Sequence, residues 1–436
     1  MSKIYKAIVN NILDCKDREE LHDVIWSAFY DKNRVCRKNC GQDLKIVILN
    51  APCNGFGDLI FALKLSNYLR DWYNAQVTIA TTLEKGLLGL GADPKYVVGL
   101  VGKEPSSIKN LQCRRFARLK MSKDLPKQDL IFIGPMQMDY DPNLIDVKKL
   151  LPYSNILNTF FFSEYNDGLD KGFDFNTGVG NDRDGLLLTK VPKKKKRLPA
   201  LSNKYAIVYV AQSIGGVNKC ISNFVQMVAK KYSKKGIKKF DIVVPPWFID
   251  VKKHLVKKLL AYYNTISITI LDKNKDNEPI TTILGQNESS VKSVLCFKTN
   301  ILPVSNSDML ELMKNSVKDI LLTGDQSVSD ALSCCPTKNV FYQVADWKKD
   351  FAYKMAKLLP NHYYTSIKTS CGGVKAVRYN SHYDKFVKKW GFKVLGKPKL
   401  DAIILGAIAM KNDYKIKELA EVVVKEQLRS VKNKLI

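Results

Sequence analysis

A chain of 436 residues is long enough for two domains of ordinary size with extensions, and a hydrophobic fraction of 45% is enough to build their cores. The 70 Lys and Arg residues against 42 Asp and Glu give a formal net charge of +28, which is far from the usual balance of a metabolic enzyme. Such a charge favours polyanionic surroundings, namely nucleic acid, anionic lipid or phosphorylated ligands. The alternative is a compositional bias, because the lysines are spread along the chain rather than gathered in one arm.

The ten cysteines do not follow the pattern of a small, disulfide-stabilised secreted domain. Cys36 and Cys40 lack a second pair at zinc spacing, so we expect no metal site. The chain starts with a polar helical segment rather than a signal peptide, and no run approaches the roughly 20 apolar residues of a membrane span. We therefore expect an intracellular protein in a reducing compartment, either cytoplasmic or nuclear, or associated with a virion.

Residues 1–43 begin the pattern along the chain, with apolar side chains at helical spacing that predict a helical N-terminal extension. Residues 44–190 alternate short apolar strands with helices, which predicts a Rossmann-like domain with a parallel, doubly wound sheet. Its predicted strands are 45–50, 76–81, 96–100 and 130–133, and its predicted helices are 59–73 and 83–90. Residues 155–184 are aromatic and rich in Gly, Asp and Asn; we interpret them as a lid or acceptor loop, with a surface Ω-loop as the alternative.

A basic linker, residues 191–204, follows this domain. Two prolines flank five consecutive cations, which are Lys193, Lys194, Lys195, Lys196 and Arg197. Five adjacent like charges repel one another and stay solvated, which is typical of a linker. The same run also matches a nuclear-import or nucleic-acid-binding tract, and both interpretations stay open.

Residues 205–375 predict a second Rossmann-like domain, and residues 376–436 a helical C-terminal extension. The predicted strands of the second domain are 205–210, 240–244, 266–271, 320–322 and 340–343, with helices at 222–231 and 310–313. We find no literal repeat between the two halves, although both follow the same alternation of strand and helix.

The first of two informative strand-to-helix junctions contains Asn54-Gly55-Phe56-Gly57-Asp58. Ligands of doubly wound sheets bind beyond the carboxyl ends of the strands, and Asp58 is expected there as a general base. The alternative role of Asp58 is to cap the N-terminus of the following helix, and the two roles are compatible. Asn54, Gly55 and Gly57 would border the acceptor, since glycine lets a substrate approach the backbone closely.

The second junction is Gly324-Asp325-Gln326-Ser327, which lies between a strand predicted from an uninterrupted apolar run and a predicted helix. Ser327 and the free backbone N–H groups at the helix start could hold a diphosphate. Gln326 could bind phosphate or sugar hydroxyls, and Phe341 or Tyr342 could border a nucleobase. The alternative is a helix cap followed by a buried strand, without a ligand.

Several catalytic motifs are absent from the chain, which has only four histidines. There is no Gly-x-Ser-x-Gly, no Walker lysine loop and no His-Glu-x-x-His, which argues against a serine hydrolase, a P-loop ATPase or a zinc metalloprotease.

The two junctions resemble those of glycosyltransferases with two Rossmann domains, the GT-B fold, and the layout is most similar to heptosyltransferases and protein-arginine rhamnosyltransferases. Those families place a Gly-Asp dipeptide at the first junction, which corresponds to Gly57-Asp58 here, and the resemblance implies Asp58 as the base. The Gly-Glu-Asp-Ser turn that holds the donor diphosphate in the rhamnosyltransferases corresponds to residues 324–327. Gln326 stands where that turn has its second acid, and Thr323 where an Arg is expected, so the donor sugar stays open. The Lys- and Asn-rich composition is associated with AT-rich genomes such as those of large DNA viruses.

The resemblance implies an α/β protein of two Rossmann-like domains with a cleft between them, with Asp58 and Ser327 on its walls. It implies an inverting transferase that uses a nucleotide-sugar as co-substrate, without metal or other cofactor. The alternatives are a non-catalytic, nucleic-acid-associated protein on the same scaffold and a glycosyltransferase that modifies DNA. Steep salt dependence of DNA binding would favour the nucleic-acid hypothesis, and saturable binding of a nucleotide-sugar would favour the enzyme.

Overall fold

The structure is a computed structural model, and its chain forms two compact units. Unit 1 comprises Met1–Leu187 and Phe392–Ile436, and unit 2 comprises Leu188–Gly391. The described residues are 40–52, 56–101, 120–121, 125, 127–135, 158–166, 173–180, 182–189, 201, 203–271, 279–288, 292–335, 338–358, 365–371, 374–380 and 397–412.

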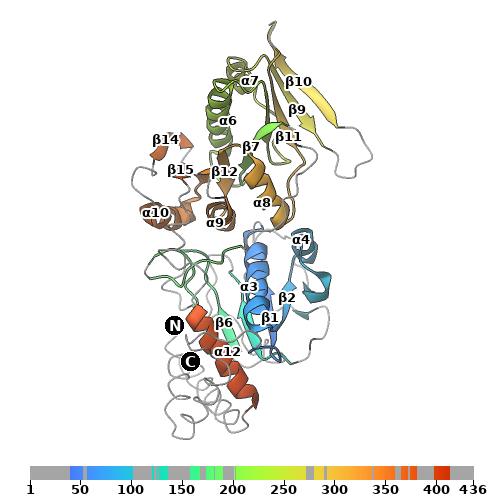
Figure 1. The fold of residues 1–436 in the computed structure, drawn as a ribbon, viewed down its shortest axis with the longest axis vertical. Helices are drawn as coiled ribbons and strands as arrows, with labels where there is room; N and C mark the ends of the chain where they lie inside the picture. The colour runs from blue at the N-terminus through green and yellow to red at the C-terminus, as the bar shows by residue number, and fades with distance from the viewer. Residues whose placement is uncertain are drawn as a thin grey trace, which may run out of the picture. The chain divides into compact units, whose positions relative to one another are not determined.

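Unit 1 is built on a six-stranded sheet with the strand order β4-β3-β2-β1-β5-β6. Figure 1 labels β1, β2 and β6 of this sheet. The strands are β1 Lys45–Asn50, β2 Gln76–Thr81, β3 Val97–Val101, β4 Lys120–Met121, β5 Leu130–Ile133 and β6 Thr159–Phe161. All neighbouring pairs are parallel except β3 with β4. The helices are α3 Gly57–Tyr73 and α4 Glu84–Gly89, with a 3-10 turn η1 at Pro94–Tyr96 and the C-terminal α12 at Lys397–Asn412.

The central position of two strands in unit 1 agrees with their hydrophobicity. Strands β1 and β5 are apolar on both faces and buried, as expected for central strands of a parallel sheet. The order in which strands are added reverses between these two parallel strands: β2 and β3 are added on one side of β1, and β5 and β6 on the other. The pair β1 and β5 therefore marks the topological switch point of this sheet.

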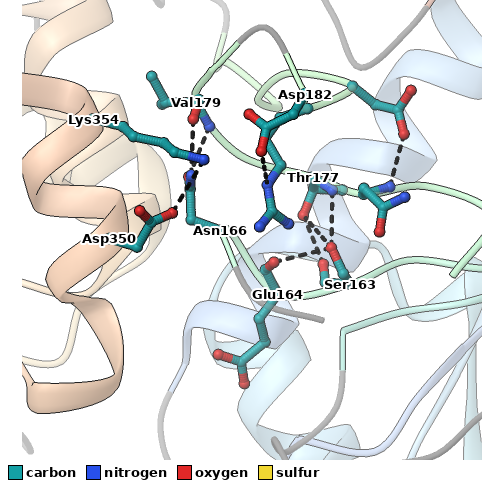
Figure 2. Close-up of polar contacts among 11 residues, drawn as sticks. Ser163, Glu164, Asn166, Thr177, Val179, Asp182, Asp350 and Lys354 are labelled. Carbon is teal, nitrogen blue, oxygen red and sulfur yellow. Dashed lines mark hydrogen bonds and ion pairs between the residues drawn. The ribbon is translucent and has the colours of Figure 1, made fainter. Parts of the chain in front are cut away.

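The aromatic segment after β5 belongs to the core of unit 1. Phe162 and Phe175 stack with ring centroids 4.2 Å apart, and both are buried. Side-chain hydrogen bonds join the two halves of this segment (Figure 2). The Thr177 hydroxyl donates to the Ser163 carbonyl (2.6 Å). The Asn166 side chain donates to the Val179 carbonyl (2.8 Å) and accepts from the Val179 N–H (2.7 Å). The described part of this segment is thus neither a lid nor a surface Ω-loop, because its aromatic side chains fill the core, and its role as an acceptor loop stays a prediction.

Helix α12 packs on unit 1 through a buried apolar face that includes Leu400 and Ile404. Polar contacts join it to the end of α3 and to the residue before β5: the Tyr73 hydroxyl donates to Asp401 (2.6 Å), and Lys411 pairs with Asp129 (3.0 Å). Residues from the C-terminal part of the chain therefore complete unit 1.

Unit 2 contains a nine-stranded sheet with the order β10-β9-β11-β8-β7-β12-β13-β15-β14. The strands are β7 Lys204–Tyr209, β8 Lys239–Val243, β9 Thr265–Ile270, β10 Ile280–Gln286, β11 Val294–Thr299, β12 Asp319–Thr323, β13 Asn339–Gln343, β14 Thr365–Cys371 and β15 Val374–Asn380. The helices are α6 Val217–Ser233, α7 Lys253–Leu259, α8 Asn306–Asn315, α9 Asp325–Cys334 and α10 Lys349–Leu358, with a 3-10 turn η6 at Asp346–Lys348.

Strand order in unit 2 reverses between β7 and β12, which pair in parallel. The chain adds β8, β9 and β11 on one side of β7 and then returns to place β12 and β13 on the other. The predicted fold class is confirmed, since both units are Rossmann-like with parallel central strands. Strands β10, β11, β14 and β15 and helices α7 and α10 were not predicted from the pattern, and the extension predicted over residues 1–43 lies almost wholly outside the described residues.

Candidate functional site

The carboxyl edge of the unit 1 sheet carries a buried polar network around Asn50, the last residue of β1. Asn50 is fully buried; its side-chain amide donates to the Asp58 carbonyl (3.0 Å), and its amide oxygen accepts from the Thr81 hydroxyl (3.1 Å). The Thr81 oxygen also accepts from the backbone N–H of Leu83 (3.2 Å). Asn50 thus ties the start of α3 to the ends of two neighbouring strands.

Asp58 is the second residue of α3, at the topological switch point of unit 1. The N-cap position is occupied by Phe56, whose side chain makes no capping hydrogen bond. The N-cap role that the sequence allowed for Asp58 is therefore wrong, because the helix starts one residue before it. A half-buried carboxylate in the first turn is still favoured by the helix dipole.

Gly57 is exposed, and a Cβ at this position would meet no described atom within 4 Å. Packing within the described chain therefore does not require a glycine here. Asn54 and Gly55, the other two predicted acceptor residues, lie outside the described residues, as does the basic run Lys193–Arg197.

In unit 2, two helix N-termini follow the two strands at the switch point. Helix α6 follows β7 with Gly216 at its N-cap (φ 74°), and α9 follows β12 with Gly324 at its N-cap (φ 79°). Because glycine has no side chain, neither N-cap residue can accept a hydrogen bond from the backbone donors of its helix through a side chain. The left-handed φ explains the glycine at both positions, because other residues are strained there.

Asp325 and Tyr342 are joined to each other. The Tyr342 hydroxyl donates to one carboxylate oxygen of Asp325 (2.9 Å), and the other carboxylate oxygen pairs with the ammonium group of Lys348 (2.8 Å). Tyr342 is 1% exposed, with its ring edge-on to Phe351. These contacts hold the start of α9 to β13 and to η6. The Tyr342 ring is packed in the core and leaves almost no surface for a nucleobase.

The other two residues of this turn differ in accessibility. Gln326 is buried, whereas Ser327 is half-buried in the first turn of α9. Ser327 belongs to unit 2 and Asp58 to unit 1.

Gln343, the last residue of β13, is the main site residue that the sequence analysis missed. It is fully buried, and its side-chain amide accepts from the Ala211 N–H (3.0 Å) and donates to the Ala211 carbonyl (3.3 Å). Its own carbonyl accepts from the Thr323 hydroxyl (3.3 Å). Gln343 therefore ties the loop before α6 to the ends of β12 and β13. Like Asn50, it is an amide that ends an otherwise apolar strand, and that signal was available in the sequence.

The described residues contain no group of three His, Cys, Asp or Glu that could hold a metal ion. Among the helices that the structure describes, none is long and apolar enough to cross a membrane. Cys220, Cys296, Cys334 and Cys335 are buried and are not disulfide-bonded. Cys40, in contrast, is disulfide-bonded, which the prediction of a reducing compartment did not anticipate.

Comparison with known proteins gives fold-level likenesses only. No protein-family profile matches the chain, and neither does any curated protein sequence. A Listeria monocytogenes protein assigned as a UDP-N-acetylglucosamine 2-epimerase matches with a TM-score of 0.34 and 9% identity, covering 83% of this chain and 91% of its own. A family 9 glycosyltransferase of Veillonella parvula matches with the same TM-score and identity, covering 81% of this chain and 97% of its own. At such scores neither likeness carries an argument, and the fold class rests on the strand orders of this chain.

Proposed function

We propose that this protein is an inverting glycosyltransferase that binds a nucleotide-sugar at the carboxyl edge of unit 2 and uses Asp58 of unit 1 as its base. One observation carries the proposal: each of the two junctions found in the sequence lies at the point where the strand order of its own sheet reverses. Ligands of open α/β sheets bind at such switch points, outside the carboxyl ends of the strands.

The donor diphosphate is proposed to bind at the N-termini of α6 and α9. Because β7 and β12 are hydrogen-bonded neighbours, the helices that follow them start at adjacent strand ends. Backbone N–H groups without a side-chain cap, together with two positive dipole ends, favour a diphosphate. Ser327 would add a hydroxyl donor from the first turn of α9.

In the proposed reaction, an acceptor oxygen forms a bond to the anomeric carbon of the sugar as the bond from that carbon to the diphosphate oxygen breaks. The acceptor proton passes to the Asp58 carboxylate, and the departing nucleoside diphosphate takes the bonding electrons. The helix N-termini of unit 2 would stabilise the charge that develops on the diphosphate. A single displacement of this kind inverts the anomeric configuration and requires neither a metal nor another cofactor.

The first test is a thermal-shift panel of nucleoside diphosphates and nucleotide-sugars on the full chain. A ligand present at about 100 times its dissociation constant should stabilise the native state by roughly 2.7 kcal/mol. If no nucleotide shifts the unfolding transition, the proposed function is wrong.

The second test uses the donor found in that panel and an acceptor screen with Asp58→Asn. We expect the variant to keep its fold and its donor affinity and to lose about 10²–10⁴-fold in transfer rate, the usual contribution of a general base. Glu84→Gln is the matched control, because Glu84 lies in the first turn of α4 after β2, away from the switch point. Turnover near that of the wild type in Asp58→Asn would refute the role of Asp58.

A second candidate function, association with nucleic acid, is favoured by the net charge of +28 and by the basic run Lys193–Arg197. Replacing those five residues with Ser should weaken non-specific DNA binding and flatten its salt dependence, since each lost phosphate contact removes about 0.9 from the log–log slope. An unchanged slope would show that the run does not contact DNA. DNA as the acceptor of sugar transfer would unite both candidates.

A further inference from the structure

An exposed indole lies at the carboxyl edge of unit 2. Trp347 is 51% exposed and belongs to η6, the short turn that follows β13. The aromatic residues that the sequence suggested for a nucleobase contact, Phe341 and Tyr342, are 3% and 1% exposed. The Phe341 and Tyr342 rings of β13 are therefore packed in the core. Trp347, which follows β13, has the accessible ring.

The position of Trp347 is set by the contacts of its neighbour Lys348. The Lys348 ammonium group pairs with Asp325, and both side chains are nearly buried, with 10% and 11% of their surface exposed. The Lys348 N–H also donates to the Ala345 carbonyl (2.9 Å), which closes the turn. Because Asp325 is the first residue of α9, this ion pair holds η6 beside the N-terminus of that helix.

The Lys348–Asp325 ion pair leaves the Trp347 indole exposed and fixes the backbone of η6, which carries that indole. Of the large aromatic side chains whose burial the structure describes in unit 2, most are buried, among them Phe240 and Tyr263. A half-exposed Trp keeps a large apolar face in water, and a planar ligand would cover that face. The ligand proposed for the adjacent helix N-terminus contains such a planar group, its nucleobase.

We propose that Trp347 is the stacking platform for the nucleobase of the donor; this inference rests on the proposed function. Lys348, Asp325 and Tyr342 act as positioning residues that hold the platform in place. Stacking on an aromatic ring contributes to affinity with little dependence on the identity of the base, since every base has a π-face. The platform would therefore separate nucleotides from base-free phosphates rather than one nucleotide from another.

The test is calorimetric titration of the full chain with UDP, ADP and GDP, and with inorganic pyrophosphate as the base-free probe. For the nucleoside diphosphate that binds the wild type, Trp347→Ala should weaken binding about 5- to 150-fold, the range for loss of one stacked base. The affinity for pyrophosphate should not change, and Trp347→Phe should recover most of the nucleotide affinity. Tyr353→Ala is the matched control, since Tyr353 is 55% exposed on the following helix, α10.

Tryptophan fluorescence adds a spectroscopic readout. The chain has five Trp residues, and a base stacked on Trp347 should quench part of their emission. Trp347→Phe should abolish that quenching while nucleotide binding persists.

The outcomes separate the two proposals. If no nucleoside diphosphate binds the wild type, the proposed function fails and the platform fails with it. If a nucleoside diphosphate binds the wild type and Trp347→Ala alike, or if the substitution weakens nucleotide and pyrophosphate binding equally, only the platform is refuted.

Discussion

Gln343 offers the sharpest test of how unit 2 holds its carboxyl edge. Its side-chain amide satisfies both backbone groups of Ala211, which lies 132 positions away in the chain. Gln343→Met keeps nearly the same side-chain volume and removes both hydrogen bonds. The substitution therefore isolates the polar contacts from the effect of a cavity.

The expected cost follows from those two contacts. Leaving a buried donor or acceptor without its partner costs about 1–3 kcal/mol, and water partly replaces the lost bonds because Ala211 is half-buried. We expect a loss of about 2 kcal/mol in the unfolding free energy of unit 2. For a unit of this size, that loss lowers the melting temperature by about 4–8 °C.

Thermal unfolding followed by circular dichroism measures the shift, and hydrogen exchange at the Ala211 amide locates it. Gln226→Ala is the matched control: its amide donates to the Ser222 carbonyl within the same helix (3.1 Å) and tethers no distant segment among the described residues, so the shift should be small. Nucleotide affinity should fall in Gln343→Met, because the loop that leads into α6 loses its tether. A melting temperature within about 1 °C of the wild type, with unchanged exchange at Ala211, would refute the reasoning.

Two further predictions concern unit 1. Gly178→Ala should destabilise the protein by about 3 kcal/mol or more in chemical denaturation, because φ is +131° and the new Cβ would lie 2.3 Å from the Asn166 side-chain oxygen, whereas Gly57→Ala should be nearly neutral. Burial raises the pKa of Asp174 to about 6. A hydrogen bond from the Phe161 N–H acts in the opposite direction, but its effect is smaller. The folded state therefore binds more protons than the unfolded state between about pH 4 and 6, and this group makes stability fall as pH rises through that window. Asp174→Asn keeps an acceptor for that N–H, so it should remove this pH dependence and raise the unfolding free energy at pH 8 by about 1–2 kcal/mol; an unchanged pH profile would contradict the assignment.

The strand-to-helix junctions could be predicted because their signals are local. An apolar run such as residues 45–50 buries both faces of a strand, and a small-residue turn followed by amphipathic spacing starts a helix. The bounds of β1, β2 and β5 agree with the sequence prediction at both ends.

Other elements depend on contacts that no short window contains. Strand β11 is a six-residue run in polar surroundings, and it becomes a central strand only by pairing with β8 and β9. Strand β10 has mostly exposed side chains, so its pattern lacks the alternation of a half-buried strand. It is held by antiparallel pairing with β9. The aromatic segment around Phe162 and Phe175 looked like a loop because the stacking that buries it is made across 13 positions of the chain.

For the candidate site, the sequence by itself located Asp58 and residues 324–327, because a turn between an apolar strand and a helix can be recognised from neighbouring residues. Only the tertiary structure decided which of those side chains make contacts within the protein. Asp325 accepts a hydrogen bond from Tyr342, and Phe56, not Asp58, is the N-cap residue of α3. It also placed both junctions at the reversals of strand order, and it brought Gln343 to Ala211. Strand order and tethers of this kind are set by pairing and packing between segments far apart in the chain, from the β1–β5 pair Ile46 and Leu130 to the contact of Gln343 with Ala211 across 132 positions, and such contacts leave no periodic trace in the local sequence.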